Sequence, residues 1–93
     1  MIIVEVLYFA DFKDISGKSR ELFLLEKKSL RELIDLIIGK YPKIKDLILE
    51  NNDNKIKNTI SIAINDNITK SIDLNISLNN EDKIAFLLPF SGG

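Results

Sequence analysis

The sequence contains neither cysteine nor histidine. Without cysteine there is no disulfide and no thiolate nucleophile, and without both residues there is no zinc site of the usual kind. The missing histidine also removes the commonest acid–base group and the usual activator of a serine nucleophile. We therefore expect a protein that is not an enzyme by itself, with no metal and no permanently bound cofactor.

The chain also lacks a large excess of either charge, because 13 basic residues balance 14 acidic ones and leave a net charge of -1. Such a balance does not favour nucleic acid or anionic lipid as a partner. The apolar N-terminal stretch MIIVEVLYF is too short to span a bilayer and lacks the basic start of a signal peptide. The expectation is a cytoplasmic protein with no nucleic-acid or membrane partner.

With 93 residues, 45% of them hydrophobic, the chain is long enough for one modest core. We predict a single domain over residues 1–93. Its globular part covers residues 1–88, and residues 89–93 form a flexible tail.

Hydrophobic periodicity predicts the elements of this domain. The expected strands are 2–9, 20–26, 59–64 and 83–88, with a helix over 30–39 and a short helical turn over 44–49. The first strand is apolar on both faces, which predicts a central strand covered on both sides. Asp11 is a candidate cap for a helical turn that Gly17 ends. The conformations of 44–57 and 66–78 stay open, and the alternation in 72–78 permits a strand or an irregular edge.

The helix carries the clearest local signal. Ser29 followed by Glu32 is a capping box, in which each residue satisfies a free N–H group of the other. The order strand, strand, helix, strands indicates an α+β fold, a mixed sheet covered by one main helix. Right-handed crossover geometry then predicts that the first strand has a parallel neighbour.

The sequence PFSGG follows the last predicted strand directly. Glycine loses more backbone entropy on ordering than any other residue, so a fold gains little from Gly92 and Gly93. Five extended residues reach about 17 Å, at ~3.4 Å each, which is long enough to enter the pocket of a partner. Pro89 restricts the start of this tail and lowers the entropy cost of ordering it.

Four stretches of the chain resemble the ubiquitin-like sulfur carriers of the β-grasp fold, and most closely the small subunit of molybdopterin synthase. They are LYFADFKDISG (7–17), SLRELIDLI (29–37), SIAIND (61–66) and LNNEDKIAFLLPFSGG (78–93). There are departures. The family usually has glycine in the turn that reads Asn79-Asn80-Glu81-Asp82 here, and Leu88 stands where a first proline is usual.

The resemblance implies a chemistry at the C-terminus. A ubiquitin-activating-type (E1-like) partner would use ATP to adenylate the Gly93 carboxylate, next to Gly92. An activated sulfur would then convert it to a thiocarboxylate, the reactive form that donates sulfur in molybdopterin synthesis. The second implied partner is the large subunit of the synthase, and the resemblance allows a heterotetramer of the two subunits. The metal, molybdenum or tungsten, is not fixed by the sequence.

The resemblance also implies partner-binding residues near the tail: Phe9, Leu87, Pro89, Phe90 and Ser91. From the sequence alone, Phe9 and Leu87 fit the core equally well, whereas Phe90 lies past the strand. Three other functions stay open. The chain could be a ubiquitin-like modifier conjugated through Gly93 to lysines, a thiamine-type sulfur carrier, or an interaction domain with an inert tail.

Overall fold

The computed structural model describes residues 1–51, 55–69 and 73–89. Within them, one sheet has the strand order β2-β1-β5-β3-β4. The strands are β1 (Ile2–Leu7), β2 (Arg20–Leu25), β3 (Ser61–Ile64), β4 (Asn67–Thr69) and β5 (Lys83–Leu87). The helical segments are α1 (Ala10–Ser16), α2 (Leu30–Lys40), the 3-10 turn η1 (Pro42–Ile44) and α3 (Lys45–Ile48).

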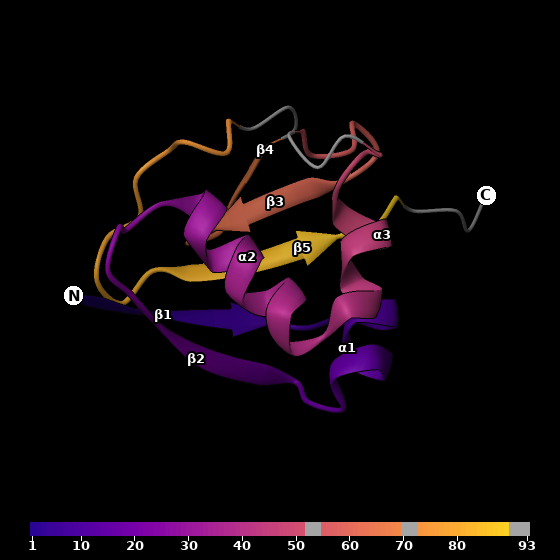
Figure 1. Cartoon of the computed structure of the whole chain (residues 1–93), viewed down its shortest axis with the longest axis horizontal. Helices are drawn as coiled ribbons and strands as arrows, with labels where there is room; N and C mark the ends of the chain where they lie inside the picture. The colour runs from indigo at the N-terminus through magenta and orange to yellow at the C-terminus, as the bar shows by residue number, and fades with distance from the viewer. Residues whose placement is uncertain (52–54, 70–72, 90–93) are drawn as a thin grey trace.

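The sheet is mixed, as expected. β1 pairs antiparallel with β2 and parallel with β5, so the predicted parallel neighbour of the first strand is confirmed. β5 also pairs antiparallel with β3, which forms a hairpin with β4. β1 and β5 are therefore the inner strands that the apolar runs predicted (Figure 1).

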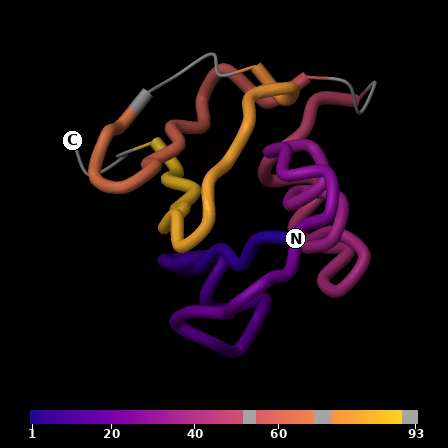
Figure 2. The backbone as a smooth tube through the Cα atoms, turned by 90° about the vertical axis from the view of Figure 1, so that its left-hand side faces the viewer, coloured from indigo at the N-terminus to yellow at the C-terminus, as the bar shows by residue number. Residues whose placement is uncertain are grey.

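Helix α2 covers one face of the sheet, and the side view shows it on one side of the strands (Figure 2). Strand alternation sends Val4 and Val6 into the core against the buried face of α2. The opposite face, here called the outer face, carries the intervening residues of each strand. The prediction that the first strand is covered on both sides is therefore wrong, because Ile3 is 44% exposed on the outer face.

Helix α2 begins after its predicted cap Ser29, but the reciprocal half of the predicted capping box differs, because the Glu32 side chain binds the three residues before Ser29. The Ser29 hydroxyl accepts a 3.1 Å hydrogen bond from the backbone N–H of Glu32. The Glu32 carboxylate accepts from the backbone N–H groups of Glu26, Lys27 and Lys28. This side chain therefore orders the connection from β2 as well as the helix end.

The other boundaries differ in detail. Asp11 does not cap α1, because Phe9 occupies the capping position and makes no side-chain bond there. Gly17 does end that helix, in the left-handed region at φ 74°. The described part of 72–78 is not a strand. Instead, the carbonyls of Leu74 and Ile76 accept hydrogen bonds from the first N–H groups of α2.

Candidate functional site: the outer face beside the C-terminal strand

The last described strand, β5, leads through Leu88 to the exposed Pro89. Phe90, Ser91, Gly92 and Gly93 lie outside the described residues, so the expectations for them stay expectations. Leu88 is half-buried and packs against the core. Among the described residues, Leu88 is the last that packs against the core, and Pro89, the predicted start of the tail, follows it.

A shallow hollow of about 270 Å³ lies on the outer face beside this exit. It combines residues from the ends of β1 and β5 with residues of the β3–β4 hairpin. The lining residues are Leu7, Phe9, Ala63, Asp66, Ile68, Lys83, Ala85 and Leu87. We call this site the outer-face hollow.

Phe9 and Leu87, the two predicted contact residues that lie within the described sheet region, both line the hollow. Phe9 is 50% exposed, so it is not a core residue. Leu87 is half-buried and faces outward, because it follows the buried Phe86 in β5. The structure thus brings them together from segments nearly eighty residues apart in sequence.

Small residues make the hollow. Ala63 and Ala85 are paired across β3 and β5 on the outer face, where larger side chains would fill the space. Ile68, 65% exposed, forms the far wall on β4. The sequence did not identify Ile68, Ala63 or Ala85. For the two alanines, a usable signal was their alternation with isoleucine or phenylalanine, which indicates an outer face with small side chains.

The β3–β4 hairpin is held by a turn with two residues in the left-handed region, Asn65 (φ 50°) and Asp66 (φ 75°). This geometry is that of a type I′ turn, which matches the twist of the strands. The Asn65 amide donates a 2.7 Å hydrogen bond to the buried carboxylate of Asp82, and its oxygen accepts from the Lys83 N–H. The hairpin, and with it Ile68, is therefore fixed to the start of β5.

A second wall of the hollow is formed by Phe9. A buried carboxylate holds the backbone directly before this residue. Glu21 on β2 faces the core and accepts hydrogen bonds from the hydroxyls of Tyr8 (3.0 Å) and Tyr41 (2.9 Å). Two ammonium groups, of Lys18 and Lys40, also bind it. Since Tyr8 is anchored inward, strand alternation directs Phe9 outward. No pattern in the sequence predicted this cluster.

The same contacts set the protonation of the cluster. Burial alone would raise the pKa of the Glu21 carboxyl, but the four side-chain donors outweigh it and lower the pKa to about 2. Burial, followed by the hydrogen bond to Glu21, raises the pKa of the Tyr8 hydroxyl. The cluster therefore holds an ionised carboxylate and a neutral tyrosine at neutral pH, an arrangement suited to structure.

Within residues 1–51, 55–69 and 73–89, no three His, Cys, Asp or Glu side chains come together as a metal site. None of the helices in this part of the chain has the length and hydrophobicity that a membrane crossing requires. The site thus offers an apolar surface for contact, next to the strand that leads to the tail.

Comparison with known proteins decides the family. The family model described as ThiS family matches residues 6–93. The chain belongs to the ThiS family. The expected relationship to ubiquitin-like sulfur carriers is thereby confirmed.

The chain is also similar to the molybdopterin synthase sulfur carrier subunit of Anopheles gambiae, with 29% identity over 97% of this chain and 91% of that protein. The solution structure of small archaeal modifier protein 1 from Methanosarcina acetivorans has a TM-score of 0.82 at 28% identity, covering 100% of this chain and 98% of that one. A putative molybdopterin converting factor, subunit 1, from Pyrococcus furiosus has a TM-score of 0.75 at 22% identity, covering 97% and 100%. The predicted β-grasp fold is confirmed.

Proposed function

We propose that this ThiS-family protein is a sulfur carrier for molybdopterin synthesis, working through the carboxylate of Gly93. The observation that carries the proposal is full-length similarity to a molybdopterin synthase sulfur carrier subunit, together with a family match that runs through Gly93. The apolar outer-face hollow beside β5 supports it, because a carrier must dock on partners next to its reactive end.

The chemistry has two steps. The Gly93 carboxylate attacks the α-phosphorus of ATP, forming an acyl-adenylate as pyrophosphate leaves. Hydrosulfide, supplied by a sulfur donor, then attacks the activated carbonyl. A carbon–sulfur bond forms, and AMP leaves with the electron pair of the broken C–O bond. The resulting thiocarboxylate sulfur attacks an electrophilic carbon of the acceptor, and a leaving group departs from that carbon with the electron pair of its broken bond. Water then hydrolyses the acyl thioester: the acyl–sulfur bond breaks, the sulfur stays on the acceptor as a thiol, and the Gly93 carboxylate is regenerated.

This chain contributes binding and access to those steps, whereas the partners supply the catalytic groups. Phe9, Leu87 and Ile68 offer apolar contact area, and apolar side chains of this kind supply much of the energy at protein interfaces. Pro89 stiffens the start of the tail, and Phe90 and Ser91 are proposed as further contacts. Gly92 and Gly93 leave no Cβ to obstruct close approach in a partner's pocket.

The proposed partners are an E1-like adenylating enzyme that binds the ATP and the large subunit of molybdopterin synthase, as a heterotetramer with this chain. The protein itself is proposed to hold no permanent cofactor and to catalyse no reaction alone. Its proposed location is the cytoplasm.

The second candidate is a protein modifier, conjugated through Gly93 to lysines. Similarity to a small archaeal modifier protein, at 28% identity over the full chain, favours it. Both functions begin with adenylation of Gly93, so they differ only in the product that follows: a thiocarboxylate for the sulfur carrier, or an amide bond to a lysine for the modifier. Lys-Gly-Gly remnants on cellular proteins after proteolysis would support conjugation.

Complementation tests the sulfur-carrier function. A strain lacking this gene should lose molybdoenzyme activity and regain it with the intact chain, but not with a chain lacking Gly92 and Gly93. Gly39→Ala is the matched control and should leave activity intact, because in the described part of the chain a methyl group there meets nothing within 4 Å beyond its own helix backbone and chain neighbours. Full activity of the shortened chain would refute the proposal.

A further inference from the structure

Strand β2 lies at one edge of the sheet (Figure 1) and is unusually apolar for an edge. Edge strands in soluble proteins generally carry charges, prolines or bulges that prevent pairing with another chain. Here Leu22 and Leu24 are 66% and 56% exposed on the outer face. The pairing of β2 with β1 runs without a bulge from Arg20 to Leu25.

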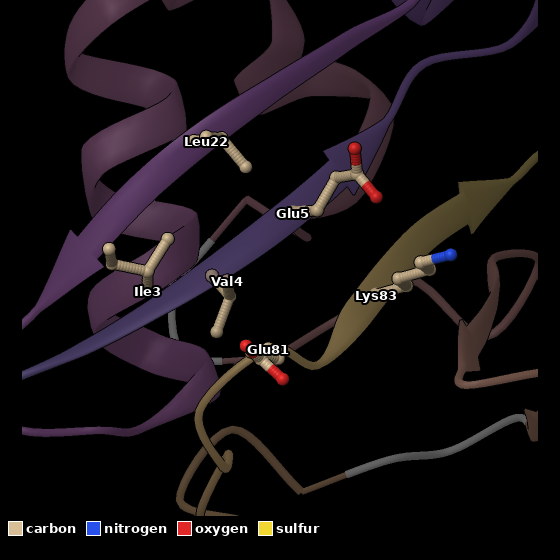
Figure 3. Close-up of a pocket in the computed structure, with 6 residues that line it drawn as sticks. All are labelled: Ile3, Val4, Glu5, Leu22, Glu81 and Lys83. Atoms are coloured by element: carbon tan, nitrogen blue, oxygen red, sulfur yellow. The ribbon is translucent and has the colours of Figure 1, made fainter.

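Leu22 and Leu24 form, together with Ile3 of β1, a second apolar patch on the outer face, apart from the outer-face hollow. Leu24 lies opposite Ile3 in the pairing, and Leu22 lies opposite Glu5. Figure 3 shows Ile3 and Glu5 on β1 beside Leu22 on β2. In the sheet order β1 separates β2 from β5, β3 and β4, and no residue of β2 lines the outer-face hollow, so a partner at the β2 edge leaves the hollow accessible.

The backbone of β2 is arranged for pairing at this edge. The Tyr8 N–H donates a 2.8 Å hydrogen bond to the Ser19 carbonyl. In an antiparallel pair, hydrogen-bonded and non-hydrogen-bonded positions alternate. The N–H and C=O groups of Arg20, Leu22 and Leu24 therefore point away from β1, and in the described chain no other segment hydrogen-bonds to them.

We propose that a second copy of this chain pairs antiparallel with β2, about a two-fold axis through Phe23. In this register Leu22 lies opposite the partner subunit's Leu24, and Arg20 lies opposite the partner subunit's Glu26. Each Leu22–Leu24 pair exchanges both backbone hydrogen bonds, because both residues have outward N–H and C=O groups. The result is one continuous sheet through two subunits.

Charge selects this register and favours a second copy over an unrelated strand. An axis through Leu22 places Arg20 opposite a leucine, and an axis through Leu24 places it opposite Lys28. The axis through Phe23 sets Arg20 and Glu26 against each other on both sides of the leucines. The axis through Leu22 instead sets Glu26 opposite the partner subunit's Lys18, whose ammonium group already binds the buried Glu21 within its own subunit. The Arg20 guanidinium binds Glu5 through Nη1 at 3.1 Å and is 74% exposed, so its remaining donors are accessible to a partner.

The interface is short, so the dimer is expected to be weak, and the measurement must reach about 1 mM protein. Sedimentation velocity should show a monomer–dimer equilibrium. Leu22→Lys should weaken it at least about tenfold, because it places a charge within the leucine pairs. Ile68→Lys is the matched control: it changes an equally exposed residue on the same face and should leave dimerisation unchanged.

A charge exchange tests the register. Arg20→Glu and Glu26→Arg should each abolish self-association, because each sets like charges opposite one another twice. Mixed together, the two variants should form a heterodimer, in which both pairs are again opposite in charge. Circular dichroism confirms that each variant is folded. A monomer at every concentration, or a mixture that fails to associate, would overturn the proposal, and the outcome does not depend on the sulfur-carrier function.

Discussion

The hydroxyl of Tyr8 donates a 3.0 Å hydrogen bond to the buried carboxylate of Glu21, at the end of β1. The next residue, Phe9, points to the opposite face and lines the outer-face hollow. A buried polar contact thus fixes the backbone at the place where an apolar contact residue is presented.

Glu21 is expected to make the free energy of unfolding depend on pH in the acid range. Its pKa is lowered from 4.5 to about 2, so its contribution is complete above 4.5 and is lost as the pH falls toward 2. Glu21→Gln removes the charge that two ammonium groups and two hydroxyls bind. At neutral pH the variant should lose on the order of 2–3 kcal/mol of unfolding free energy, measured in urea.

The pH profile separates charge from shape. The stability difference between the wild type and Glu21→Gln should shrink as the pH falls through this window, because the wild-type carboxyl becomes neutral too. A difference that stays constant down to pH 2 would contradict the assignment.

Glu81 is expected to be a destabilising residue. It lies in the left-handed region at φ 71°, in the turn that precedes β5. Glu81→Gly should raise the unfolding free energy by about 0.5–1 kcal/mol, since only glycine adopts this conformation without strain. As a control, Asp35→Gly in the exposed part of α2 should have the opposite sign.

Glu32 should stabilise the junction between β2 and α2. Its carboxylate accepts backbone hydrogen bonds from three consecutive residues, Glu26 to Lys28. Glu32→Ala should lower the unfolding free energy by about 1–2 kcal/mol. An unchanged denaturation midpoint would show that water replaces these bonds at no cost.

Docking on the outer-face hollow should depend on its exposed apolar residues. Phe9→Asp and Ile68→Asp should each lower kcat/KM for adenylation by about tenfold or more, because each places a charge in an apolar interface. Leu36→Asp is the control, since Leu36 is 41% exposed on the helical side. Equal effects of all three variants would mean that the hollow is not the docking surface.

The sequence predicted those parts of the fold that depend on local patterning. The alternation in 59–64, the capping box at Ser29 and the apolar runs of β1 and β5 all led to observed elements. The apolar run of β1 did not reveal that one face is uncovered, because Ile3 and Leu7 on the outer face are as apolar as Val4 and Val6 on the core face.

The candidate site was predictable only in part. Phe9 and Leu87 were identified through family resemblance, and the structure places both at one hollow. Ile68 was missed, because a single isoleucine after a turn has no periodicity. Glu21 was missed since its partners, Tyr8 and Tyr41, converge only after β1, β2 and α2 pack together.

The central claim, that Gly93 carries sulfur, is tested most directly by intact-mass spectrometry. The protein is incubated with ATP, a molybdopterin-pathway adenylating enzyme and a sulfur donor. The account predicts a mass increase equal to one sulfur-for-oxygen exchange, located by fragmentation at Gly93 and absent when ATP is omitted. Two controls show that the adenylating enzyme is active: it modifies its own carrier, and it adenylates this chain. If the mass of this chain stays unchanged with such an enzyme, the central claim is contradicted.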